Sequence, residues 1–219
     1  MPTWEGFRLK VQKFFRVKFA EKRKKKLVNT DFTIISNNCW GGMIYESYNL
    51  PKESPTVGMF IMAKDYIRFL KDLSSYLSSE ITFIEPQKSR WKAEKGNDPR
   101  FGSYPIGVIT NGEEEIEIFF LHYHSEEEAR DKWRRRCKRI NWDRLLVKFN
   151  DQNGCTEEDI AEFDRLPFKN KICFSVNKYP QYKSVVTIKA PCSHKYIKAS
   201  YEPFGKNRYI DITNLINSL

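Results

Sequence analysis

Long apolar runs are missing from this 219-residue sequence, and their absence excludes a membrane-spanning protein. A transmembrane helix needs about 18 or more consecutive apolar residues, and no stretch approaches that length. The N-terminus also lacks the uninterrupted apolar segment of a secretory signal. We therefore expect a cytoplasmic protein.

Cysteines are few and scattered along the chain. The five of them are an odd number and include no Cys-x-x-Cys pair: Cys39, Cys137, Cys155, Cys173 and Cys192. A disulfide framework or a structural zinc site would require paired or clustered cysteines. The pattern favours a reducing compartment, and we expect neither a metal nor a cofactor.

Acidic residues are scarce at the N-terminus, where basic residues gather instead. Residues 1–26 contain ten basic and two acidic residues, so they carry +8 of the formal net charge of +10, and residues 27–219 carry only +2. A nucleic-acid-binding domain usually spreads its positive charge over a folded face. The distribution therefore predicts a basic appendage on a nearly neutral domain, and no nucleic-acid partner.

An amphipathic helix is predicted at the N-terminus, over residues 4–20. Its apolar residues recur mostly at steps of three or four: Trp4, Phe7, Val11, Phe14, Phe15 and Phe19. Such a helix, with the EKRKKK run after it, is typical of a segment that lies on an anionic membrane, here the inner face. The alternative is a helix packed on its own domain. We divide the chain into a basic segment, residues 1–29, and a domain, residues 30–219.

Short apolar runs alternate with helical patterns through the rest of the chain. Strands are predicted near residues 32–35, 57–62, 81–85, 105–110, 115–124, 145–149, 171–176 and 184–190, and helices near 64–79, 125–140, 156–166 and 211–219. Asn111-Gly112 predicts a hairpin turn, and Thr156 with Asp159 predicts a capping box. This alternation is typical of an α/β fold, so we predict a single three-layer α/β/α domain with a mixed, largely parallel central sheet.

A polar, glycine-rich turn with one cysteine, Cys39, follows the first predicted strand. A helix beginning near residues 43–48 would place the thiol close to the positive end of a helix dipole, which lowers a cysteine pKa. Backbone N–H groups of residues 38–41 would be available as an oxyanion hole. The alternative is a buried cysteine that packs as a small hydrophobe beside Trp40.

Two further predicted strands also end in chemically active residues. His122 and His124 end one of them, and Asn150 and Asp151 follow another. Ligands bind beyond the carboxyl ends of strands in open α/β sheets. A thiol, an imidazole and a group that orients the imidazole are the components of a Cys-His nucleophilic site.

We therefore predict Cys39 as the nucleophile, His122 as the general base and Asp151 as the orienting group. The residues predicted to bind substrate are Asn38, Trp40, Gly41, His124 and Asn150. The alternatives are a histidine that is only a hydrogen-bonded surface residue and an Asn-Asp pair that belongs to an ordinary turn.

Four segments carry a resemblance to a known family: ISNNCWGGMIY, SPTVGMFI, FLHYHSEEEARDKWRRRCKRINWD and NDQNGCTEED. The sequence resembles, over about residues 30–215, a bacterial family of exopolysaccharide biosynthesis proteins whose members accompany genes for capsule and cell-surface polysaccharides. The family has no established reaction. The resemblance implies a role in surface polysaccharide biosynthesis and a glycan or lipid-linked saccharide precursor as partner.

A more distant resemblance is to bacterial papain-like cysteine proteins. The resemblance rests on Cys39 with Trp40, Ser54-Pro55, His122 and Arg134-Arg135. The two glycines after Trp40 depart from the papain-like pattern. This resemblance implies that His122, rather than His124, is the partner of Cys39.

Three functions follow as hypotheses. The first is a thiol-dependent acyl transferase or hydrolase that acts on a glycan precursor. The second is a non-catalytic sugar-binding or capsule-assembly module with Trp40, Trp91, Trp133 and Trp142 as stacking surfaces. The third, a glycosyltransferase, is disfavoured because no Asp-x-Asp signature is present to hold the metal of a nucleotide sugar.

Overall fold

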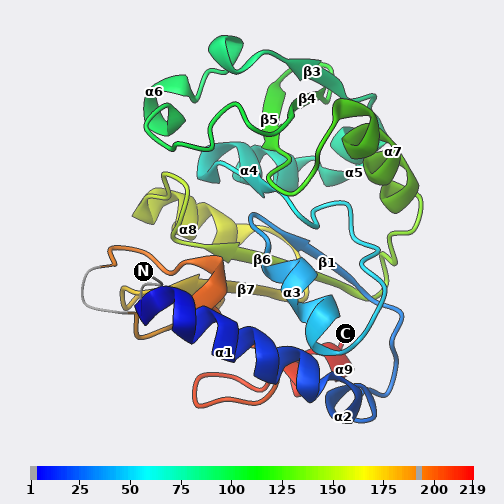
Figure 1. The fold of residues 1–219 in the computed structure, drawn as a ribbon, viewed down its shortest axis with the longest axis vertical. Helices are drawn as coiled ribbons and strands as arrows, with labels where there is room; N and C mark the ends of the chain where they lie inside the picture. Colours follow the sequence, from blue (N-terminus) through cyan, green and yellow to red (C-terminus); the bar gives the residue numbers. More distant parts are fainter. Residues whose placement is uncertain (1–3, 191–193) are drawn as a thin grey trace.

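The structure is a computed structural model that describes residues 4–190 and 194–219, so Cys192 lies outside the described residues. It is an α/β protein with two sheets, one drawn above the other in Figure 1. The helices are α1 (Trp4–Lys18), α2 (Ala20–Lys24), α3 (Trp40–Ser47), α4 (Ala63–Lys71), α5 (Leu73–Ser78), α6 (Lys92–Lys95), α7 (Glu126–Cys137), α8 (Glu157–Arg165) and α9 (Ile212–Asn217). Two short 3-10 helices are η1 (Pro86–Lys88) and η2 (Ala199–Tyr201).

The first sheet is parallel and has the order β1-β6-β7-β8. Its strands are β1 (Thr33–Ser36), β6 (Leu145–Asn150), β7 (Lys171–Ser175) and β8 (Val185–Thr187). Neighbouring side chains point to opposite faces, so Ile34 joins one hydrophobic cluster and Ile35 the other. Helices α3 and α9 belong to the cluster on one face, and α4 and α8 to the cluster on the other. The expected three layers are therefore present around this sheet.

The second sheet is antiparallel and has the order β2-β5-β4-β3. Its strands are β2 (Phe60–Ile61), β3 (Thr82–Ile84), β4 (Ile106–Thr110) and β5 (Glu115–Phe119). The predicted hairpin turn joins β4 to β5, with Gly112 at a φ of +100°. The outer face is covered by residues of the 86–105 excursion, including Trp91 and Phe101.

The α/β class is confirmed, and the structure refines its arrangement. The expected single mixed sheet is divided into a parallel and an antiparallel sheet. The division follows from chain order, because residues 37–144 leave β1, build the second sheet, and return to pair β6 alongside β1. Consecutive antiparallel strands pair locally and do not need the edge of the first sheet.

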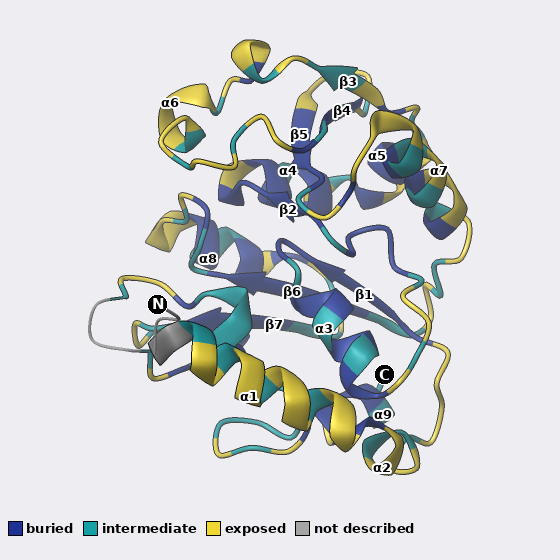
Figure 2. Cartoon of the chain, viewed as in Figure 1, coloured by how far each residue is buried: buried dark blue, intermediate teal, exposed yellow. Residues whose placement is uncertain are grey.

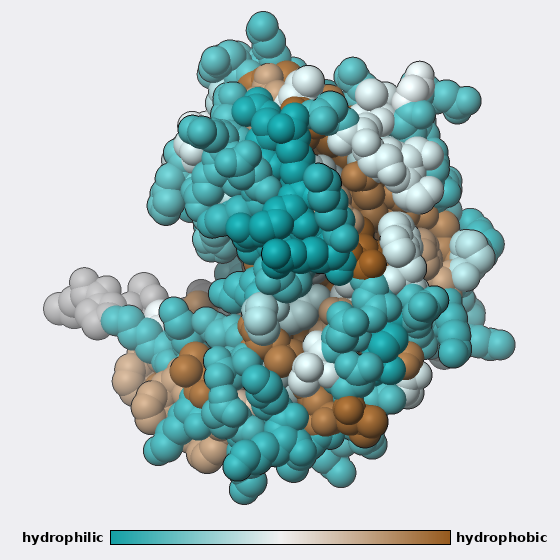
Figure 3. Space-filling view, turned by 90° about the vertical axis from the view of Figure 1, so that its right-hand side faces the viewer, coloured by the Kyte–Doolittle hydropathy of each residue, from teal (hydrophilic) through white to brown (hydrophobic). Residues whose placement is uncertain are grey.

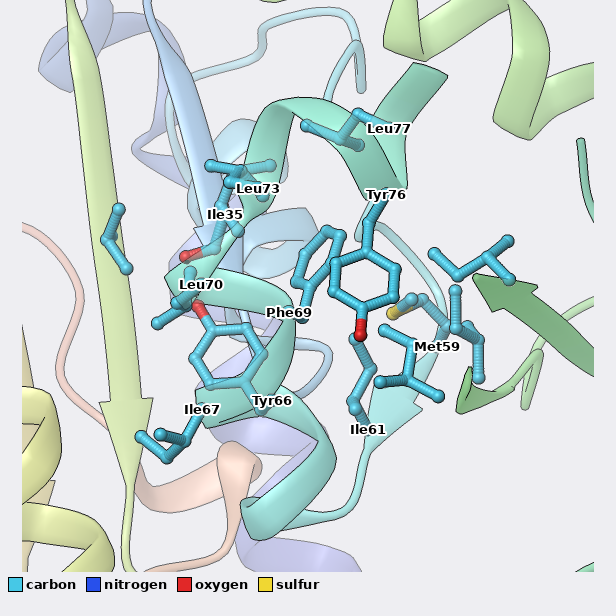
Figure 4. Packing of buried hydrophobic residues seen from close by; sticks show 14 of the residues in the cluster. Ile35, Met59, Ile61, Tyr66, Ile67, Phe69, Leu70, Leu73, Tyr76 and Leu77 are labelled. Carbon is cyan, nitrogen blue, oxygen red and sulfur yellow. Dashed lines mark hydrogen bonds between the residues drawn. The ribbon is translucent and has the colours of Figure 1, made fainter. Parts of the chain in front are cut away.

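Helix α4 lies between the two sheets and joins their cores. It places Tyr66 and Leu70 beside Ile35 of β1, while Met59 and Ile61 lie on its other side (Figure 4). The predicted helix over residues 64–79 is broken at Asp72, between α4 and α5. One hydrophobic cluster therefore extends from the parallel sheet to the antiparallel sheet, with α4 between them.

Two predicted helix starts are confirmed by their capping bonds. Ser125 Oγ accepts from the backbone N–H of Glu128 at the start of α7. Thr156 and Asp159 form a full capping box at the start of α8. Side-chain oxygens thus satisfy N–H groups that a helix start leaves without intrahelical partners.

The N-terminal helices pack on the parallel layer. Arg16 of α1 pairs with Glu46 of α3 at 2.8 Å, and Arg23 Nη1 of α2 donates to the carbonyl oxygen of Ser47 at 2.8 Å. Figure 2 shows α1 on the outside of this layer with much of its length exposed. No helix in the described part of the chain is long and apolar enough to cross a membrane.

Replacement of Tyr66 by Phe tests the link between α4 and the parallel sheet. The Tyr66 hydroxyl lies 2.9 Å from the carbonyl oxygens of both Ile35 and Lys148, in β1 and β6. Loss of a buried hydrogen bond that leaves acceptors without a donor should lower the free energy of unfolding by about 1–3 kcal/mol, measured by urea denaturation. Tyr196→Phe, at an exposed tyrosine, is the control and should change it by less than about 0.5 kcal/mol. Equal stability of Tyr66→Phe and the parent would contradict this role.

Candidate functional site

A pocket of about 500 Å³ lies where α1 and α3 meet the segment after β5 and helix α7. Two of the three predicted catalytic residues, Cys39 and His122, line it. The other lining residues are Lys13, Arg16, Gly42, Met43, Glu46, Lys52, Val57, Gly58, Tyr123, Lys132 and Arg136. Residues from five separate parts of the chain therefore converge on one cavity, as expected of a ligand site.

Cys39 occupies the position between β1 and α3, and α3 begins at the next residue. Its Sγ lies 3.7 Å from the carbonyl oxygen of Met59. Burial raises the pKa of the Cys39 thiol to about 11, and the nearby Glu202 carboxylate raises it further, while Lys148 opposes this. The direction is opposite to the lowered pKa expected from a helix start, because removal from water outweighs the helix dipole.

His122 reaches the pocket from a turn and not from a strand. Strand β5 ends at Phe119, so the expected extension of the strand through His122 and His124 is wrong. The backbone N–H of His122 donates to the carbonyl oxygen of Gly58 at 3.0 Å. Gly58 has a φ of +79°, which favours glycine, and a Cβ there would lie 3.5 Å from that of His122.

The surroundings of His122 favour its neutral imidazole. Partial burial lowers the pKa of His122 from its ordinary value, and the positive charges of Arg100 and Lys52 lower it further. No hydrogen bond joins His122 to Cys39 within the part of the chain that the structure describes. His124 is exposed, and its backbone N–H donates to Glu128 Oε2 at 2.9 Å. Both histidine residues are exposed, and of the two only His122 lines the pocket.

Asp151 lies outside the pocket and is not brought to His122. Its carboxylate accepts from the backbone N–H groups of Val176 at 2.7 Å and Ile197 at 2.8 Å, and from Ser175 Oγ at 3.0 Å. Burial raises the Asp151 pKa, and the two backbone N–H groups oppose this. Its acceptor positions are engaged in joining β7 to the 197 segment, so it is not placed to orient the imidazole.

The expected oxyanion hole is also engaged in local bonds. The backbone N–H of Trp40 donates to Asn38 Oδ1 at 3.1 Å, and that of Gly41 donates to Ser36 Oγ at 3.3 Å. A Cβ at Gly41 would lie 3.1 Å from the same oxygen, so this glycine permits close packing of α3 on β1. The N–H groups of Trp40 and Gly41 are therefore engaged within the turn.

Asn38 and Asn150 do meet beyond the carboxyl ends of β1 and β6, but in a buried cluster. Asn150 Nδ2 donates to Glu202 Oε1 at 2.8 Å, and Asn38 Nδ2 lies 3.3 Å from both oxygens of that carboxylate. Asn37 Nδ2 donates to Asn150 Oδ1 at 2.9 Å. The sequence reasoning placed Asn38 and Asn150 at the correct edge of the sheet, and the space there is filled by Glu202.

The centre of this cluster is an ion pair between Lys148 and Glu202. Lys148 Nζ lies 2.5 Å from Glu202 Oε1, both side chains are fully buried, and Nζ also donates to Asn38 Oδ1 at 2.9 Å. Burial lowers the pKa of Lys148 and raises that of Glu202, and each charge opposes the shift of the other. Sequence reasoning missed this pair, although a lysine inside the apolar run LLVKF is a signal of a buried cation.

The pocket itself is basic, which the sequence reasoning also missed. Five cationic side chains line it, Lys13, Arg16, Lys52, Lys132 and Arg136, against one carboxylate, that of Glu46. Arg16 pairs with Glu46, and Lys132 pairs with Glu128. Lys13, Lys52 and Arg136 form no ion pair with any described residue. The pocket therefore has an excess of positive charge.

Arg136 is the most buried of these cations, with 7% of its surface exposed. Its Nη1 donates to the Tyr123 hydroxyl at 2.6 Å, which in turn donates to the carbonyl oxygen of Val57. Its Nε is buried without an acceptor in the described part of the protein. A buried guanidinium without a carboxylate partner is costly unless an anion joins it, so this side chain points to an anionic ligand.

The tryptophans expected as stacking surfaces do not line this pocket. Trp40 and Trp133 are buried in the two large hydrophobic clusters, and Trp40 Nε1 donates to the carbonyl oxygen of Pro203 at 2.8 Å. Trp91 Nε1 donates to Asp65 Oδ2 at 2.8 Å. Trp142 is exposed in the segment between α7 and β6.

Comparison with known proteins shows the family of this chain. The model of a family described as a domain of unknown function, DUF1919, matches residues 10–219. The chain belongs to the DUF1919 family. A relative described as an uncharacterised protein of Haemophilus influenzae is 37% identical over 204 residues, which cover 92% of this chain and 89% of the relative. The family match begins inside α1, so it includes most of the N-terminal segment as well as the pocket.

Separate removal of the two charges in the buried pair tests the cluster of this DUF1919 protein. Lys148→Met leaves the Glu202 carboxylate buried without a cation, and Glu202→Gln leaves the ammonium group without an anion. Each should lower the free energy of unfolding by about 3–5 kcal/mol, and the double variant by less than the sum, in urea denaturation. The exposed pair Arg134–Glu80 is the control, and Arg134→Met should cost less than about 1 kcal/mol. Additive losses would contradict a coupled pair.

Alkylation by iodoacetamide tests the state of the Cys39 thiol. With a pKa of about 11, its reaction should be slow at pH 7 and should rise about tenfold per pH unit up to pH 10, followed by mass spectrometry of peptides. Burial raises the pKa of Cys137 to about 12 and also raises that of Cys173, so both thiols should react only at a higher pH than Cys39. Cys39→Ser identifies the peptide. A rate that levels off between pH 7 and pH 8 would instead show a thiolate stabilised near neutrality.

Proposed function

We propose that this protein acts in the biosynthesis of a cell-surface polysaccharide in the cytoplasm, and that its pocket binds an anionic saccharide precursor. The observation that carries the proposal is the pocket itself, where five cations and one carboxylate surround Cys39 and His122. The saccharide part of the proposal rests on the resemblance to exopolysaccharide biosynthesis proteins. The anionic part rests on the charge of the pocket.

Charge and burial together favour a phosphate or carboxylate group as the anchor of the ligand. Lys52 and Lys13 are exposed cations of the lining, while the buried Arg136 donates a hydrogen bond to Tyr123. A guanidinium presents fixed N–H donors that match the oxygens of phosphate and carboxylate. A neutral sugar would leave this positive charge uncompensated, so precursors such as sugar phosphates fit better.

Cys39 and His122 are the groups that would act on a bound precursor in the enzymatic form of this proposal. Because the thiol is neutral, His122 would accept its proton as Sγ attacks an acyl carbon, and a thioester would form. The proton on His122 would pass to the departing oxygen. Water or a sugar hydroxyl would then attack the thioester, lose its proton to His122, and release Cys39, which regains that proton.

A non-catalytic binding module is the second candidate. Two observations favour it: the raised pKa of Cys39, and the lack of a hydrogen bond from His122 to the thiol among the described residues. In this form the pocket holds the precursor for another protein of the pathway. Binding of the anion is common to both forms, and chemistry on the precursor separates them.

Calorimetric titration with glucose 1-phosphate, glucuronate and glucose tests the anionic requirement. The two anions should bind and glucose should not, because only a charged group compensates the cations of the pocket. Lys52→Glu should weaken binding about tenfold, which corresponds to about 1.4 kcal/mol. Lys169→Glu reverses the charge of an exposed lysine outside the pocket and should leave binding unchanged. Equal weakening by both variants would show only a general effect of net charge.

An acylated sugar phosphate separates the enzymatic form of the proposal from the binding module. Incubation with an acetylated sugar phosphate should yield acetate and a Cys39 thioester in the enzymatic form, seen by mass spectrometry. Cys39→Ala and His122→Gln should then lose turnover while they retain binding of glucose 1-phosphate. Retained binding without turnover in the parent protein would favour the binding module, and absence of binding would reject both.

A further inference from the structure

Helix α1 carries its apolar side chains on the face that points away from the protein. Residues four, seven and eight apart lie on one face of a helix, and Phe7, Val11, Phe14 and Phe15 share that spacing. Phe14 is 56% exposed, Phe15 48% and Val11 37%. A helix packed on its own domain ordinarily turns such a face to the core, so this orientation is inverted.

The opposite face of α1, which is mixed in character, makes the contacts with the domain. Leu9 and Gln12 are half-buried there, and Arg16 pairs with Glu46 and reaches Met43 Sδ at 3.3 Å. At the other end, Arg8 lies 4.8 Å from the ring centroid of Tyr201. These contacts fix the rotation of the helix about its axis, so the outward apolar face is a property of the fold.

The exposed apolar residues of this protein are concentrated in this one segment. Among the described residues, six of the nine large hydrophobic side chains classed as exposed lie between positions 7 and 19: Phe7, Val11, Phe14, Phe15, Val17 and Phe19. A group of tan and brown side chains also stands at the lower left edge of a largely teal surface in Figure 3. An exposed apolar cluster of this kind marks an interaction surface.

Positive charge surrounds this apolar face. Lys10, Lys18, Lys22, Lys25 and Lys26 are exposed, and they form no ion pair with any described residue. Lys18 Nζ lies 5.1 Å from the ring centroid of Phe14. Residues 1–26 carry +8 in total. The surface thus combines rings that enter an apolar layer with ammonium groups that meet anionic headgroups.

We propose that α1 and α2 form a docking surface for an anionic lipid membrane, with the aromatic side chains of α1 inserted at the level of the headgroups. Charge complementarity selects this occupant, because a second copy of the same surface would bring +8 against +8. Amphipathic helices with basic and aromatic residues bind membrane interfaces in this way. The attraction weakens with salt because the charges are exposed.

The docking surface adjoins the pocket through the same helix. Lys13 and Arg16 of α1 line the pocket, whereas Phe14 and Phe15 between them point outward. Membrane binding would therefore place one wall of the pocket next to the headgroup layer. The inference does not depend on the proposed function, because it rests on the exposed side chains of the N-terminal helices and not on the pocket.

Flotation of the full-length protein with lipid vesicles tests the proposal. The parent should float with vesicles of equimolar phosphatidylglycerol and phosphatidylcholine and should stay in solution with pure phosphatidylcholine. Phe14→Ser/Phe15→Ser should lower the fraction bound at least about tenfold. Salt that shortens the Debye length to about 3 Å should release the parent.

Trp142→Ser is the matched control, since this exposed aromatic residue lies outside the N-terminal helices and its loss should leave binding unchanged. Near-ultraviolet circular dichroism of each variant checks that the fold is retained. Equal binding of the parent and Phe14→Ser/Phe15→Ser would overturn the proposal, as would binding that ignores salt. A dimer in sedimentation velocity that this variant abolishes, without vesicle binding, would show that a second copy covers the face.

Discussion

The ion pair between Lys148 and Glu202 is the interaction on which the arrangement of the site depends. It joins the middle of β6 to the segment after residue 197, and its hydrogen bonds extend to Asn38 beyond β1. Burial of two charges is costly, and the cost is offset only when every remaining donor and acceptor is satisfied. Asn38 and Asn150 provide those bonds. The turn that carries Cys39 is therefore tied, through Asn38, to both members of the ion pair.

This pair also explains why the Cys39 thiol is neutral although the pocket beside it is positively charged. The charges of Lys148 and Glu202 largely cancel, so Cys39 sits beside a neutral, dry cluster, and burial dominates its pKa. On the other side of Cys39 the cations of the pocket have no matching set of carboxylates. A neutral thiol next to an uncompensated positive field favours a ligand that brings its own negative charge.

Local patterns in the sequence predicted most helices and strands, because capping residues, turn residues and apolar periodicity act over a few positions. The capping box at Thr156 and the turn at Gly112 are examples. The division into two sheets could not be predicted, since it depends on which strands pair across residues 37–144. At the site, Cys39 and His122 line one pocket, and their catalytic roles stay a prediction. Asp151 does not line that pocket, because an acidic residue at a strand end satisfies nearby backbone N–H groups just as well.

The orientation of α1 could not be predicted from the sequence either. Its apolar spacing identifies a face but not the partner of that face, because a core and a membrane interface both accept aromatic side chains. The contacts of the mixed face distinguish them: the ion pair of Arg16 with Glu46 helps to turn that face inward, and the rings then face out. A soluble domain gains nothing from this arrangement, since exposed phenylalanine forfeits the free energy of burial. The exposed rings are therefore best understood as one half of an interface whose other half is a separate surface.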